Sequence, residues 1–146
     1  VVFVCTSAAL FDMMVYPTLW TGNFEVFELK SAQVTPEERT IIIVGTVYHP
    51  PSATDSLSLD YLHESLSKIE AIFPDFGLFL FGDFNKLNCS RLRKVFGLHQ
   101  IVPFPTRGHS NLDLVFTNLS AFYDVHKKLP PFGLSDHGTV EVRLLA

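Results

Sequence analysis

The chain has 146 residues, of which 47% are hydrophobic and 18% charged, and its formal net charge at pH 7 is −4. This length suits a single domain with a substantial core. The acidic balance is unusual for a protein that binds nucleic acid by broad neutralisation of phosphates, although a local basic rim can coexist with it. The apolar runs at residues 1–5, 41–47 and 76–81 are far shorter than the roughly 20 residues needed to cross a bilayer, so we expect no membrane-spanning segment.

The first half of the chain predicts a strand followed by a helix. Residues 40–49 are rich in β-branched side chains and stop at two prolines, which is typical of a strand. Apolar residues then recur at helical spacing, which predicts a helix over residues 57–73. Asp55 or Ser56 is placed to cap that helix, and Pro74 ends it.

The second half predicts one buried strand, a short helix and three more strands. Residues 76–81 are almost entirely apolar, which indicates a buried strand. Ser90 is placed to cap a short helix that Gly97 closes. The further strands are expected over residues 112–118, 121–126 and 138–145. Periodicity alone indicates an α/β or α+β protein.

Polar side chains follow the apolar strands. Asp83 and Asn85 come directly after residues 76–81, and because they are two residues apart they project the same way from an extended chain. A plain turn explains this pair about equally well, since Asp and Asn are common turn residues. Asp113 alternates with apolar neighbours over residues 112–118, so it lies either on an exposed strand face or at a site.

A third polar pair, Asp136 and His137, precedes the last predicted strand. A turn is again the simpler explanation when this pair is considered singly. Together, however, the three elements supply carboxylates, an amide and an imidazole at the ends of separate strands. That combination is the layout of a centre that holds a hard cation and cleaves phosphate esters.

Four segments in chain order carry a specific resemblance. They are residues 45–51, residues 82–85, residues 105–108 leading into 112–118, and residues 135–137. On these segments the sequence resembles the endonuclease/exonuclease/phosphatase family, in the version that non-LTR retrotransposons carry ahead of their reverse transcriptase. The resemblance covers residues 24–146 and is loose before that. It implies a two-sheet β-sandwich flanked by helices, incomplete at the N-terminus, as a single partial domain over residues 1–146.

The resemblance also implies catalytic roles. His137 would be the general base and Asp113 its carboxylate partner, since an imidazole titrates near neutrality and a carboxylate stabilises its charged form. Asp83 would orient the attacking water, and Asn85 would donate its amide to a phosphate oxygen. Tyr48 would place its phenol against the phosphate or the leaving group.

Metal and DNA contacts follow from the same resemblance. Asp136 would lie at or next to the metal, which is expected to be Mg²⁺ or Mn²⁺ with oxygen ligands. Arg107 and Asn111 are the predicted contacts to phosphate or DNA. The basic residues of the predicted short helix are more simply a solvated face; they are Arg91, Arg93 and Lys94.

One departure concerns the metal ligands. Family members carry an asparagine on the first strand and a glutamate, the principal metal ligand, on the second, and neither is found here. The glutamates that precede residue 40 stand in the wrong place relative to Tyr48. Metal binding is therefore expected to be weakened, and Mg²⁺-dependent nicking by the chain alone is expected to be very weak or absent. These glutamates are Glu25, Glu28, Glu37 and Glu38.

The leading function is therefore a metal-dependent, DNA-nicking endonuclease domain of a retrotransposon polyprotein, with DNA and the reverse transcriptase domain as partners. Cys5 and Cys89 lack metal-type spacing, and residues 1–20 lack a basic signal-peptide region, so we expect an intracellular protein that is nuclear when it acts on DNA. The alternatives are an inactive truncated remnant and a phosphatase or phosphodiesterase of the same fold. A Ser-His-Asp hydrolase built on Ser135 is disfavoured, because no Gly-x-Ser-x-Gly elbow occurs.

Overall fold

The computed structural model describes residues 3–6, 11–15, 24–31, 41–131 and 133–145. Within these ranges the chain forms nine strands and two helices, most of them at the positions that the periodicity predicts. In chain order they are β1 (Phe3–Thr6), β2 (Phe11–Val15), β3 (Phe24–Ser31), β4 (Ile41–Tyr48), α1 (Asp55–Ile72), β5 (Gly77–Asp83), α2 (Ser90–Phe96), β6 (His99–Gln100), β7 (Asp113–Thr117), β8 (Tyr123–Leu129) and β9 (Thr139–Leu144).

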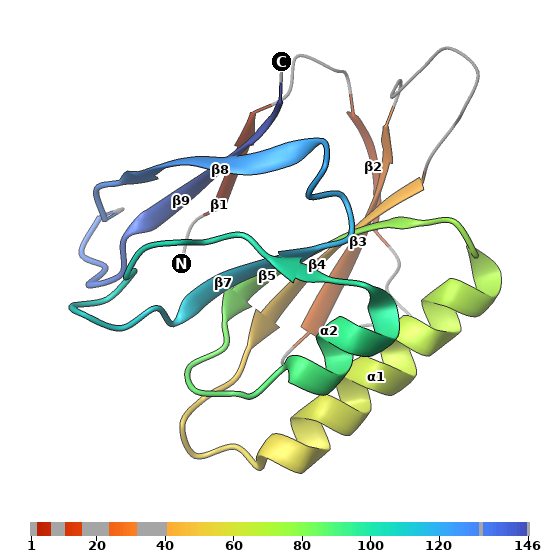
Figure 1. Ribbon diagram of the computed structural model, residues 1–146, viewed down its shortest axis with the longest axis horizontal. Helices are drawn as coiled ribbons and strands as arrows, with labels where there is room; N and C mark the ends of the chain where they lie inside the picture. Colours follow the sequence, from red (N-terminus) through yellow and green to blue (C-terminus); the bar gives the residue numbers. More distant parts are fainter. Residues whose placement is uncertain (1–2, 7–10, 16–23, 32–40, 132, 146) are drawn as a thin grey trace.

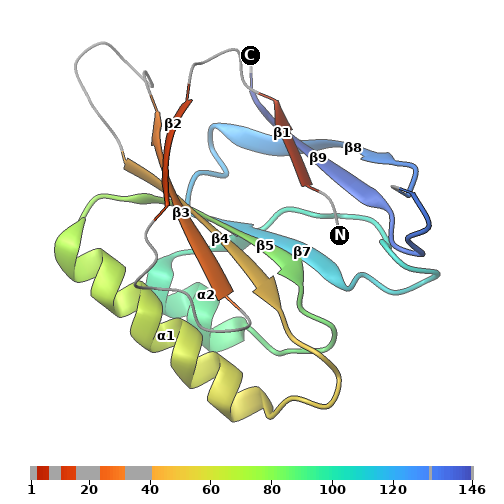
Figure 2. The same ribbon diagram turned by 180° about the vertical axis from the view of Figure 1, so that it is seen from behind.

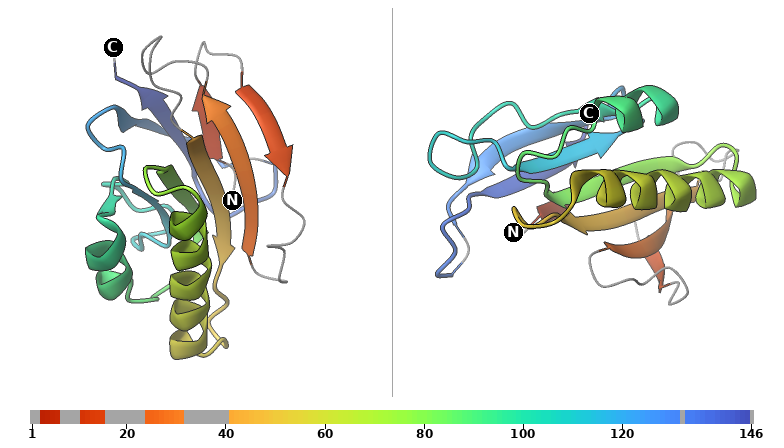
Figure 3. Two further views of the ribbon diagram at one scale, coloured as in Figure 1. Left: turned by 90° about the vertical axis from the view of Figure 1, so that its right-hand side faces the viewer. Right: turned by 90° about the horizontal axis from the view of Figure 1, so that it is seen from below.

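The strands form two sheets. The larger has six strands in the order β2-β3-β4-β5-β7-β6, and the smaller has three in the order β1-β9-β8. The sheets face each other, and both helices lie on the outer face of the larger sheet (Figures 1 and 2). The layers therefore run helices, six-stranded sheet, three-stranded sheet (Figure 3), which confirms the predicted sandwich with helices.

Strand β5 is buried on both faces, which explains its nearly continuous apolar sequence. Leu78 and Leu80 belong to the core between the larger sheet and the helices, with Leu62 and Leu66 of α1. Phe79 and its neighbour two residues on belong to the core between the sheets. The buried residues of that second core are Ile42, Phe79, Phe81, Val102, Val115, Tyr123, Val140 and Val142.

The helix boundaries correct two predictions. Helix α1 begins at Asp55 after Thr54, and no side chain caps it, so the predicted cap by Asp55 or Ser56 is wrong. The Asp55 carboxylate instead contacts His49. Helix α2 begins at Ser90 itself, with the preceding residue at the N-cap and no side-chain cap bond, whereas its predicted closure by a left-handed Gly97 at φ 62° is confirmed.

Among the described residues, neither helix has the length and apolar character that a bilayer-crossing segment requires. The four glutamates considered as metal ligands precede residue 40. Glu25 and Glu28 lie in strand β3, but their side chains are outside the description, and Glu37 and Glu38 lie outside the described residues.

Candidate active site

Two carboxylate residues meet at one end of the larger sheet. Asp83 ends β5, and Asp113 begins β7. These strands are antiparallel, and Asp83 and Asp113 are direct register partners. Tyr48, at the end of β4, is the register partner of Asp83 on its other side. The larger sheet thus places three of the predicted site residues side by side.

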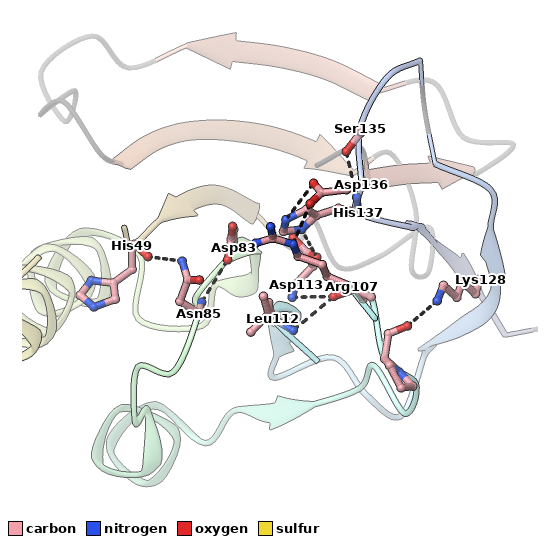
Figure 4. A network of polar contacts seen from close by, with 12 residues as sticks. His49, Asp83, Asn85, Arg107, Leu112, Asp113, Lys128, Ser135, Asp136 and His137 are labelled. Atoms are coloured by element: carbon pink, nitrogen blue, oxygen red, sulfur yellow. Dashed lines mark hydrogen bonds and ion pairs between the residues drawn. The ribbon is translucent and has the colours of Figure 1, made fainter. Parts of the chain in front are cut away.

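Asp113 and His137 form a close pair. Nδ1 of His137 lies 2.7 Å from Oδ2 of Asp113 (Figure 4). The Asp113 side chain is fully buried, and that of His137 is 12% exposed. Among the described residues, Oδ1 of Asp113 is buried with no hydrogen-bond partner. A buried carboxylate oxygen in that state is costly unless another group satisfies it.

The group that Oδ1 of Asp113 could serve is a cation. Ligand atoms of Asp83, Asp113 and His137 all lie within 4.8 Å of one another. Carboxylate oxygens are the ligands that Mg²⁺ and Mn²⁺ prefer, and imidazole suits a range of transition metals. The donor set and the unpartnered oxygen therefore fit a divalent cation.

The turn after β5 sets the position of Asn85. Its backbone is left-handed, at φ 48°, and its N–H donates to Oδ1 of Asp83 at 3.1 Å. Its side-chain Nδ2 donates to the carbonyl of His49 at 2.5 Å. Gly82 is required just before, because a Cβ there would lie 1.8 Å from the carbonyl oxygen of Val47.

Two predicted binding residues contact each other. Nε of Arg107 lies 2.7 Å from Oδ2 of Asp136, and both side chains are more than half exposed. Oδ1 of Asp136 is 3.7 Å from Nε2 of His137, so this acid lies at the rim of the site and outside the compact group of ligand atoms. An exposed pair of this kind is worth at most about 1 kcal/mol, so a phosphate or a cation can readily displace it.

Tyr48 and Asn111, the two remaining predicted site residues, lie outside the compact group of ligand atoms. Tyr48 is 55% exposed, so its phenol is accessible at the end of β4. Asn111 donates through Nδ2 to the carbonyl of Val102 at 2.8 Å, which ties its amide to the main chain of its own loop. The structure thus brings Asp83, Asn85, Asp113 and His137 together, with Asp136 and Arg107 at the rim, and does not bring the Asn111 amide into that group.

Comparison with known proteins identifies the fold. No family model matches the sequence, and no curated protein matches it. Among solved structures, the endonuclease domain of TRAS1, a telomere-specific non-LTR retrotransposon, matches with a TM-score of 0.63 and 20% identity, over 88% of this chain and 66% of that one. The chain has the endonuclease/exonuclease/phosphatase fold.

Two other structures of this fold are similar. The human Nocturnin catalytic domain with bound sulfate matches with a TM-score of 0.55 and 16% identity, over 92% of this chain and 60% of that one. The mannosyl-6-phosphatase of Bacteroides thetaiotaomicron matches with a TM-score of 0.51 and 16% identity, over 84% of this chain and 57% of that one. The chain thus spans about two thirds or less of the length of each of the three structures described here.

Sequence reasoning assigned no role to Thr106, a buried residue of the loop between β6 and β7, although it lies in a segment that matches the family. Its hydroxyl accepts hydrogen bonds from the N–H groups of Leu112 and Asp113, at 3.2 and 3.0 Å. Its carbonyl accepts the N–H of Gly138, next to His137, at 2.7 Å. Thr106 thus connects the two halves of the Asp113–His137 pair, and a lone threonine in a loop carries no periodicity that could predict this.

Sequence reasoning also assigned no role to His49, which lies in the matching segment 45–51 and is buried directly after β4. Its ring nitrogens contact Asp55 and Ser58 at the start of α1. The available signal was a titratable residue between a strand and a pair of prolines. That signal indicates where the strand ends, but it does not indicate which side chains contact the imidazole.

Proposed function

We propose that the chain is a metal-dependent phosphodiester hydrolase domain, and specifically the DNA-nicking endonuclease domain of a non-LTR retrotransposon polyprotein. The observation that carries this proposal is the buried Asp113–His137 pair beside Asp83. The likeness to the TRAS1 endonuclease domain, which has the highest TM-score among the three structures described above, supports the DNA substrate.

His137 would act as the general base. Because Nδ1 faces the Asp113 carboxylate, the proton of a neutral imidazole resides on Nδ1 and Nε2 is left as an acceptor. Nε2 can then take a proton from an attacking water, and the Asp113 carboxylate stabilises the imidazolium that results. Asp113 itself need not accept a proton.

The other polar groups would bind the phosphodiester. Asn85 would donate an amide N–H to a phosphate oxygen, the guanidinium of Arg107 would add positive charge once it leaves Asp136, and the exposed phenol of Tyr48 would contact the phosphate or the leaving group. Asp83 would orient the water. Asp83 and Asp113, with Asp136 nearby, would hold Mg²⁺ or Mn²⁺, and the ion would supply positive charge to the phosphate and the departing oxyanion.

A phosphatase or phosphodiesterase is the second candidate, because the mannosyl-6-phosphatase shares the fold. An inactive remnant is the third, because the family's metal-binding asparagine and glutamate are not found in this sequence. The Ser-His-Asp alternative gains no support, since Oγ of Ser135 accepts the backbone N–H of His137 at 3.1 Å and the His137 ring contacts two aspartates instead.

Nicking of supercoiled plasmid tests the proposal. We expect weak conversion to the open-circular form in Mg²⁺ or Mn²⁺, because the family's principal glutamate ligand is not found in this sequence. EDTA and His137→Ala should each abolish this conversion. The same preparation is assayed with p-nitrophenyl phosphate and mannose 6-phosphate. Hydrolysis of these monoesters without nicking would favour the phosphatase, and no hydrolysis of any substrate, with the fold intact, would favour the remnant.

A further inference from the structure

The imidazole of His49 takes no part in the proposed chemistry, although it belongs to the residue that follows Tyr48. Its side chain is only 4% exposed. Nε2 lies 2.9 Å from Oδ1 of Asp55, and Nδ1 lies 3.0 Å from Oγ of Ser58. A neutral imidazole satisfies both contacts when Nε2 donates to the carboxylate and Nδ1 accepts the hydroxyl proton. Both ring nitrogens are therefore held by the first turns of α1.

The main chain of His49 forms hydrogen bonds with two residues of the proposed active site. Its N–H donates to the carbonyl of Asp83 at 2.9 Å, and its own carbonyl accepts Nδ2 of Asn85. Asn85 in turn donates its backbone N–H to the carboxylate of Asp83. Three hydrogen bonds thus close a circuit through these residues, and Figure 4 shows the imidazole of His49 pointing away from Asp83.

This circuit decides how the Asn85 amide can point. A carbonyl oxygen only accepts hydrogen bonds, so only the NH₂ end of Asn85 can face His49. One of the two amide protons is used there, and the second remains for a phosphate oxygen. Asn85 also occupies a left-handed backbone conformation, which asparagine adopts more readily than most residues other than glycine.

We propose that His49 is a positioning residue for Asn85. Its ring, clamped by Asp55 and Ser58, fixes the end of β4, and the carbonyl there sets the orientation of the Asn85 amide. The inference rests on the proposed function, in which Asn85 binds phosphate. A catalytic Ser58-His49-Asp55 triad is excluded, because His49 is 3% exposed and neither ring nitrogen is open to a substrate.

The Asn85 side-chain amide, observed by ¹H–¹⁵N NMR in the full chain without substrate, tests the inference directly. In His49→Ala we expect exchange of these amide protons with water to accelerate about five- to tenfold, the equivalent of one lost hydrogen bond. Asp55→Asn and Ser58→Ala loosen the ring without removing it, so each should give a smaller acceleration. Ser56→Ala, which removes an exposed hydroxyl from the same helical turn, is the matched control and should change nothing.

The two single changes at Asp55 and Ser58 keep the test decisive if His49→Ala fails to fold. Unchanged Asn85 amide exchange in all folded variants would overturn the inference. Plasmid nicking provides the second measurement. If His49 acts through Asn85, the double variant His49→Ala/Asn85→Ala should nick DNA no more slowly than Asn85→Ala alone. A double variant whose rate falls by the product of the two single losses would contradict this role of His49. If the unchanged chain does not nick DNA, the proposed function fails, and the NMR result still decides the role of His49.

Discussion

The imidazole of His137 lies against the buried carboxylate of Asp113, with Nδ1 2.7 Å from Oδ2, although the two residues are 24 positions apart in the chain. Among the described residues, the Asp113 carboxylate has no side-chain hydrogen bond other than the one with His137. The carboxylate and the imidazole therefore form a pair. Substitutions of His137 can therefore separate its role as a base in catalysis from its contribution to the stability of the fold.

His137→Ala should lower the nicking rate by about 10²-fold or more, because the general base is lost. It should also lower the free energy of unfolding by about 1–3 kcal/mol, because Asp113 is left buried without a partner. His137→Asn places an amide donor near the same carboxylate, so it should recover stability and not activity. Nicking time courses and urea unfolding of both variants check this. Near-normal cleavage by His137→Ala would eliminate the mechanism. His99→Ala, which changes an exposed histidine, is the control and should leave both activity and stability unchanged.

A divalent cation should stabilise the fold through Asp83 and Asp113. At a concentration ten times Kd, Mn²⁺ or Mg²⁺ should raise the free energy of unfolding by about 1.4 kcal/mol, since it binds only the folded state. Asp83→Asn and Asp113→Asn should each remove most of this gain, whereas Asp124→Asn, on the exposed surface of β8, should keep it. Thermal melts with and without EDTA provide the measurement. An equal metal response in all four proteins would show that the cation binds elsewhere.

Thr106→Val should destabilise the fold by about 1–3 kcal/mol, because the N–H groups of Leu112 and Asp113 lose the hydroxyl that accepts them. The shape of the side chain is nearly unchanged, so packing does not explain such a loss. Thr106→Ser keeps the hydroxyl and should recover most of the stability. Urea unfolding compares the three proteins, and equal midpoints for the valine and serine variants would argue against the hydrogen-bonding role.

Gly82→Ala should prevent cooperative folding. A Cβ at Gly82 would lie 1.8 Å from the carbonyl oxygen of Val47, which belongs to the neighbouring strand and cannot move without breaking the sheet. Gly97→Ala is the control, since its Cβ meets open space and only the left-handed conformation is disfavoured, at about 1–2 kcal/mol. Circular dichroism melts distinguish the two. A folded Gly82→Ala protein would contradict the close approach.

Alkaline pH should destabilise the chain through Cys89. Burial raises the pKa of the Cys89 thiol to about 11 from its ordinary 9.0. The unfolded thiol therefore loses its proton first as the pH rises, and stability falls between about pH 9 and 11 while remaining unaffected below that window. As the pH rises over this range, the urea midpoint of the unchanged chain should fall relative to that of Cys89→Ala. A constant difference would indicate a thiol that ionises normally in the folded state.

Several elements could be predicted from local pattern alone. The apolar run before Asp83 becomes β5, the leucine spacing after Pro51 becomes α1, and Gly97 closes α2, because each depends on contacts or backbone preferences within a few residues. The N-terminal cap of α1 was not predictable in the same way. Asp55 has the chemistry of a cap, but a buried His49 six positions earlier competes for its carboxylate.

The sequence by itself determined which polar residues stand at the ends of strands, including Asp83, Asn85, Asp113 and His137, because hydrophobic periodicity marks where each strand stops. Only the tertiary structure decided that Asp83 and Asp113 are register partners, that Asp113 is buried rather than on an exposed face, and that Asp136 contacts Arg107. The physical reason is that strand register and loop path depend on how distant segments bury their apolar faces against one another. A local pattern fixes the direction of a side chain from its own strand, whereas its partner is set by the packing of the two sheets.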